Sequence, residues 1–90
     1  MKATILRTDG TEEEFKFKGK HPRLKEMQDV VGGYIELVYL PQGKCMVINE
    51  EGKLLGLPVN NLATKIYFET FGPVDVIVGE AIVCDAGIIK

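Results

Sequence analysis

Residues 14–18 alternate polar and aromatic side chains, which is typical of a half-buried strand with Phe15 and Phe17 facing inward. A second run that favours β structure occupies residues 2–7. An Asp-Gly pair between the two runs is a strong turn signal. The start of the chain is therefore predicted to form a β-hairpin whose loop is longer than the two-residue ideal.

The spacing of apolar residues changes to a helical period after Pro22. Leu24, Met27 and Val31 lie three and four residues apart, which predicts one apolar stripe of a short helix. Pro22 suits the first turn of such a helix, where a missing N–H costs no hydrogen bond. A glycine pair at 32–33 ends the helix, with one of the two glycines in the left-handed conformation. The helix is predicted to cover one face of a sheet.

Residues 34–40 and 44–48 are rich in β-branched and aromatic residues, with Pro-Gln-Gly between them. This pattern predicts an antiparallel hairpin. Both strands carry apolar residues on both faces, so the hairpin is predicted to form the centre of the sheet and to be covered on each side.

The next stretch leads into a second helix and holds three asparagines, two glycines and a proline. Asn49 is predicted to close a turn by bonding its own downstream backbone, with Gly52 supplying a positive φ. Residues 53–55 are predicted to be a short strand or extended chain. Asn60 or Asn61 is predicted to be the N-cap of the helix, because a carboxamide oxygen can accept from a free N–H of the first turn.

Leu62, Ile66 and Thr70 share one stripe of this second helix, and a Gly-Pro pair ends it. Residues 75–84 are then predicted to form the last strand, in which Gly79 indicates a bulge or the close approach of another backbone. Together these elements predict an α+β domain. It has an antiparallel sheet of four to five strands and two short helices, in the order β-β-α-β-β-α-β.

Composition is that of an ordinary globular protein, with 46% hydrophobic and 27% charged residues. The 90 residues predict a single domain, 1–90. The formal net charge is −2 and the basic residues are scattered, which argues against a nucleic-acid partner. No apolar run approaches the roughly 20 residues that a membrane span needs. With no signal peptide expected, the protein is predicted to be cytoplasmic.

The chain offers few groups for catalysis. It contains no serine, and its one histidine, His21, has no metal-ligating neighbour and is predicted to have a surface or capping role. Cys45 and Cys84 are predicted to be small buried side chains, with a disulfide as the alternative if their strands pair. We therefore expect no catalytic residue, metal or cofactor, and a protein that is not an enzyme. A small hydrolase or transferase is the least favoured alternative.

The start of the second helix is the first place to look for a site. Helix N-termini offer free N–H groups and a partial positive charge, which suit a phosphate or a carboxylate. Tyr67 or Tyr34 could add a ring for stacking. The candidate ligand-binding residues are Asn49, Glu51, Lys53, Asn60 and Asn61. The alternative is that Asn49 only closes a turn and Asn60 only caps a helix.

Five strings within about residues 24–85 are specific in combination: VGGYIE from Val31, NEEGKL from Asn49, GLPVN from Gly56, LAT from Leu62 and DVIVG from Asp75. Together they resemble a small family of domains of unknown function that is frequent in bacteriophages, plasmids and other mobile elements of bacteria. The resemblance implies no established activity. It implies a host-directed role, such as binding a host protein or sequestering a small nucleotide signal. The family pattern specifies asparagine where aspartate, serine or threonine would also turn or cap the chain, which is compatible with recognition.

These observations lead to two hypotheses for function. The first is a non-enzymatic binding module that acts through a protein partner or by self-association. The last strand and the tail at Ile88 and Ile89 are the surface expected for self-association, unless the tail docks back on the domain. The second is a small-ligand binder, for instance of a nucleotide, that uses the surface between Asn49 and Asn61.

Overall fold

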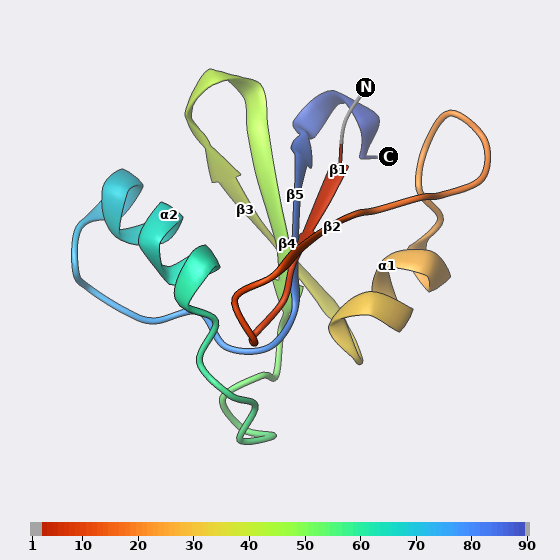
Figure 1. The fold of residues 1–90 in the computed structure, drawn as a ribbon. Helices are drawn as coiled ribbons and strands as arrows, with labels where there is room; N and C mark the ends of the chain where they lie inside the picture. Colours follow the sequence, from red (N-terminus) through yellow and green to blue (C-terminus); the bar gives the residue numbers. More distant parts are fainter. Residues whose placement is uncertain (1–2, 90) are drawn as a thin grey trace.

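The computed structural model describes residues 3–89, and it has a five-stranded antiparallel sheet with a helix on each face (Figure 1). The α+β class and the order β-β-α-β-β-α-β are confirmed. No helix among the described residues is long and apolar enough to cross a membrane. The elements are β1 (Ala3–Leu6), β2 (Glu12–Glu14), α1 (Leu24–Val31), β3 (Ile35–Leu40), β4 (Lys44–Asn49), α2 (Asn61–Phe71) and β5 (Ala81–Asp85), with 3-10 turns at Pro41–Gly43 and Ala86–Ile88.

The strands lie in the order β2-β1-β5-β4-β3. The prediction that the β3–β4 hairpin forms the centre of the sheet is therefore wrong. β5 returns between the two hairpins and pairs with both β1 and β4, which leaves β3 at one edge. The physical reason lies in β5 itself, because a strand with buried residues on both faces is best placed where the sheet is covered from both sides.

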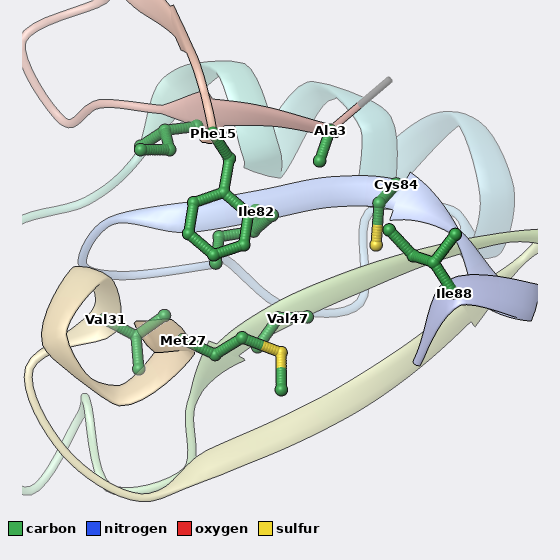
Figure 2. Close-up of a cluster of buried hydrophobic side chains, with 9 residues drawn as sticks. Ala3, Phe15, Met27, Val31, Val47, Ile82, Cys84 and Ile88 are labelled. Atoms are coloured by element: carbon green, nitrogen blue, oxygen red, sulfur yellow. The ribbon is translucent and has the colours of Figure 1, made fainter. Parts of the chain in front are cut away.

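The larger cluster of buried apolar side chains lies between α1 and the sheet. Met27 and Val31 point from α1 toward the sheet, where Phe15, Val47 and Ile82 meet them (Figure 2). Phe15 is buried as predicted, although β2 ends one residue before it. The prediction for Leu24 is wrong, because its side chain is 54% exposed at the start of the helix.

The opposite face of the sheet packs on α2. Met46 of β4 and Ala81 of β5 are fully buried there, together with Ala63 of the helix. Leu62, Ile66 and Tyr67 are only partly buried against this second cluster. These three side chains of α2 therefore keep part of their surface accessible on this face.

The last strand is shorter than predicted. β5 begins at Ala81, and residues 75–79 leave the sheet to run beside the chain that enters α2. The N–H of Gly79 donates to the carbonyl of Pro58 over 2.8 Å. Gly79 has a φ of +80°, and a Cβ there would lie 2.8 Å from Cδ1 of Leu57. A positive φ and a close neighbour thus explain this glycine, which bends the chain out of the strand.

The C-terminal tail docks on its own domain, which was one of the two alternatives. Ile88 is buried in the α1-side core, and its carbonyl lies 2.9 Å from Nδ1 of His21. Cys45 and Cys84 lie directly opposite each other on β4 and β5 as buried free thiols. Burial, and then the neighbouring Cys45, raises the pKa of Cys84 to about 11, so this thiol stays protonated and unreactive at neutral pH.

Candidate functional site

Asn49 ends β4 and holds two segments together. Its Oδ1 accepts a hydrogen bond from the N–H of Glu51 over 2.7 Å, which confirms the predicted turn. Its Nδ2 donates to the carbonyl of Val31 over 3.0 Å, at the C-terminal end of α1. A Cβ on Gly33 would lie 3.1 Å from that Nδ2, so the glycine pair gives the amide its room. Asn49 is buried, and its amide is engaged at both ends.

Asn60 is the N-cap of α2, which selects it over Asn61 among the two predicted candidates. Its Oδ1 accepts from the N–H of Ala63 over 3.0 Å. Its Nδ2 donates to two carbonyls, those of Leu6 and Gly79, each over 2.8 Å. The side chain is fully buried, so a ligand could reach it only by breaking these bonds. Aspartate, serine or threonine could supply the cap, but none of them can donate two hydrogen bonds as well.

Thr64 completes the junction; it lies in α2, but its hydrogen bonds to a distant segment were not predicted. Its hydroxyl accepts from the N–H of Ile77 over 2.9 Å and lies 3.3 Å from the carbonyl of the same residue. The N–H of Asn60 also donates to that carbonyl, over 2.8 Å. The start of α2 is thus bound to the segment 75–79 by backbone groups that would otherwise be buried without partners.

Two predictions for the intervening loop are wrong. Residues 53–55 form turns and not a strand. Gly52 does not have a positive φ; Gly56 does, at +68°. Gly52 is instead required by space, because a Cβ there would lie 2.7 Å from Cγ2 of Val78. The loop therefore packs directly on residues 75–79.

A hollow of about 200 Å³ opens beside this loop. It lies between α2, the edge strand β3, and the segments 50–54 and 75–78. Val38, Ile48 and Tyr67 give it apolar walls. Of the candidate residues, Asn49, Glu51 and Lys53 line this hollow, whereas Asn60 and Asn61 do not. Asn61 is exposed at the first turn of α2.

The charged side chains around the hollow are mostly acidic. Glu36, Glu50, Glu51 and Asp75 contribute carboxylates, and Lys53 contributes an ammonium group. Lys53 is paired with Asp75 through an exposed salt bridge. This ammonium group and the N–H of Val76 hold the pKa of the Asp75 carboxyl below its usual value. The hollow therefore presents excess negative charge at neutral pH.

Glu36 and Asp75 were not predicted to belong to this site. Glu36 comes from β3 and Asp75 from the segment before β5, so no local spacing in the sequence connects them to Glu51. Glu36 and Val38 are two residues apart on a strand, so they lie on the same face of the sheet. This spacing could have indicated which face carries the Glu36 side chain. The side of the sheet alone would not have located the hollow.

The described residues contain no group of three His, Cys, Asp or Glu side chains that could hold a metal ion. Within residues 3–89, every buried side-chain nitrogen or oxygen also has a hydrogen-bond partner. The buried polar groups are thus accounted for by the architecture, and the groups free to meet a ligand lie at the hollow and on the outer surface.

A family model described as "Domain of unknown function (DUF3846)" matches residues 1–88. The match includes the first two strands, which lie outside the residues 24–85 that carried the resemblance. No curated protein and no solved structure matched the chain. With nearly the whole chain covered by the family model, the protein belongs to the DUF3846 family of domains of unknown function.

Proposed function

We propose that the protein is a non-enzymatic binding module that recognises a partner protein at the hollow between α2 and β3. The observation that carries this proposal is the hollow itself, whose apolar walls open to solvent beneath an acidic rim. Two apolar residues at its border are also exposed to solvent: Leu54 is 87% exposed and Val76 is 37% exposed. Apolar surface rimmed by polar groups is typical of protein recognition sites.

The nucleotide alternative has less support. Sites for drug-sized ligands usually enclose roughly 300–1,000 Å³, whereas this hollow measures about 200 Å³. Its carboxylates would repel phosphate, and the ammonium group of Lys53 is already paired with Asp75. The first N–H groups of α2 are also less available to an anion, because Asn60 caps the helix with its own oxygen.

The resemblance to proteins of mobile elements indicates where the protein would act and on what kind of partner. We propose that the protein acts in the bacterial cytoplasm on a host protein, and that it belongs to a bacteriophage or a related element. A host partner would have to offer a complementary surface, with apolar side chains for the walls and positive charge for the rim.

Leu54→Ser tests the hollow directly, and Leu24→Ser is its matched control on α1. Both leucines are exposed, so neither change should unfold the protein. If the hollow binds a host protein, Leu54→Ser should weaken the purified complex by about tenfold, whereas Leu24→Ser should leave it unchanged. The partner would be captured from bacterial lysate and its affinity for each variant measured by calorimetry.

Native mass spectrometry of the freshly purified protein separates the alternatives. A retained mass of a few hundred daltons that disappears in Lys53→Met would support the small-ligand function. Equal affinity of a purified partner for the Leu54→Ser and wild-type proteins would count against the hollow as its binding site.

A further inference from the structure

The outer edge of β3 carries backbone groups without a strand partner. Within residues 3–89, β3 pairs with β4 alone and is the last strand on its side of the sheet. The N–H of Glu50 donates to the carbonyl of Tyr34 over 2.9 Å. Tyr34 therefore forms a hydrogen-bonded pair with Glu50, and this shows which residues of β3 bond to β4. Because bonded pairs alternate in an antiparallel ladder, the N–H and C=O groups of Ile35, Leu37 and Tyr39 point away from β4.

The opposite edge of the sheet is protected in a way that β3 is not. β2 has three residues, all of them exposed glutamates. Short, charged edge strands resist pairing with another chain. β3 has six residues, Ile35–Leu40, of which Glu36 is the only charged one, and it contains no proline. Its length and composition are those of a strand that can accept a partner.

The acidic hollow lies directly beside this free edge. Glu36 and Val38 project from β3 into its lining. On a strand added to β3, every second side chain would point to the same face as these two residues. A lysine or arginine there could lay its methylene groups against Val38 and place its charge near Glu36 and Glu51. Backbone pairing and charge thus favour the same kind of partner.

We propose that an extended peptide segment with basic residues at alternate positions adds to β3 as a sixth strand. This inference rests on the proposed function and names its partner class. A second copy of the chain fits the same edge less well. β3 contains no lysine or arginine, and pairing it with itself would bring two acidic hollows together. An added basic strand instead neutralises the rim and completes the backbone hydrogen bonds.

Tyr39→Pro is the variant that tests the backbone pairing. The side chain of Tyr39 is 65% exposed and its N–H points outward, so proline removes no bond of the β3–β4 ladder. Tyr39→Ala is the matched control, because it removes the same ring and keeps the N–H. Amide NMR spectra of both variants report whether the fold is retained.

The probes are labelled peptides of about eight residues, slightly longer than β3, in which lysine or glutamate alternates with valine and threonine. We expect the lysine peptides to bind and the glutamate peptides to fail. Tyr39→Pro should weaken lysine-peptide binding about tenfold relative to Tyr39→Ala, through the lost backbone bonds. Glu36→Gln should weaken it about threefold and reduce its salt dependence. Fluorescence anisotropy gives the affinities, and hydrogen exchange should show new protection at Ile35, Leu37 and Tyr39.

Three results would overturn the inference. One is equal affinity of Tyr39→Pro and Tyr39→Ala. Another is no binding of any lysine peptide at about 1 mM, where weak affinities are still measurable. The third is a dimer that only Tyr39→Pro disrupts, which would assign the edge to a second copy. A host partner that remains sensitive to Leu54→Ser in these cases would leave the proposed function standing, so the two failures are distinguishable.

Discussion

The stretch 49–61 contains two kinds of polar residue. All of them were candidate ligand-binding residues in the sequence, but their burial differs completely in the folded protein. Asn49 and Asn60 are buried, and each joins segments that are distant in the chain. Glu51 and Lys53 lie between them and are exposed at the rim of the hollow. The first pair belongs to the architecture, and the second pair belongs to the surface that can meet a partner.

The difference between them follows from chemistry. A carboxamide donates and accepts while carrying no charge, so it can be buried if every hydrogen bond is made. Carboxylates and ammonium groups are costly to bury and therefore remain at the rim. The candidate site predicted from residue types combined structural asparagines with exposed charged residues. Substitutions of the asparagines test the structural role, and substitutions of the charged residues test the binding role.

The largest effect is expected for Asn60→Asp. The variant loses two donated hydrogen bonds and places a carboxylate beside the carbonyls of Leu6 and Gly79. We expect the free energy of unfolding to fall by about 3 kcal/mol or more, measured by urea denaturation. Asn61→Asp is the matched control one residue along. It is exposed in the first turn of α2, where negative charge is tolerated, so a change within about 0.5 kcal/mol is expected.

Similar losses in the two variants would show that the buried amide does not hold the junction. An Asn60→Asp protein of normal stability would also remove the structural explanation for asparagine at position 60. Its specific use there would then again point to recognition.

The sequence predicted the local half of this arrangement. The cap of α2 and the turn at Asn49 involve neighbours three and two residues away, and both predictions are confirmed. The partners of the Asn60 amide lie 54 and 19 residues away, and no local pattern indicates them. The error at the sheet centre has the same origin, because hairpins are local whereas the insertion of β5 between them is not.

Gly52→Ala should have the next largest effect. The new Cβ would lie 2.7 Å from Cγ2 of Val78, so the loop must move away from residues 75–79. Overpacking of this kind typically costs about 1–3 kcal/mol of unfolding free energy. Gly87→Ala is the control, because its Cβ would meet no atom within 4 Å and its φ is not positive.

A double-mutant cycle with Val78→Ala identifies the cause of this loss. If the clash is with Val78, Gly52→Ala should cost less in the Val78→Ala background than in the wild type. An equal cost in both backgrounds would mean that Gly52 is needed for another reason, and the loop would not be fixed by this contact.

The smallest effect on stability is expected for Lys53→Met, which removes the exposed ion pair with Asp75. Such pairs contribute little to folding, so the urea midpoint at neutral pH should match that of a Lys65→Met control, a change at an exposed lysine of α2. The pKa of Asp75, followed by NMR, should rise toward its ordinary value. It should stay below that value, because the N–H of Val76 still donates to the carboxylate.

The sign of the pH effect follows from that direction. A depressed pKa in the folded state gives stabilisation that is present above the unfolded pKa and is lost as the pH falls through the folded pKa. Any difference in the free energy of unfolding between Lys53→Met and the wild type should therefore disappear in acid. Binding should respond in the opposite sense to stability, because an unpaired Asp75 makes the rim more acidic and should tighten the lysine peptides. A large loss of stability without a change in peptide affinity would show that Lys53 has a structural role, as the buried asparagines do, and not a binding role.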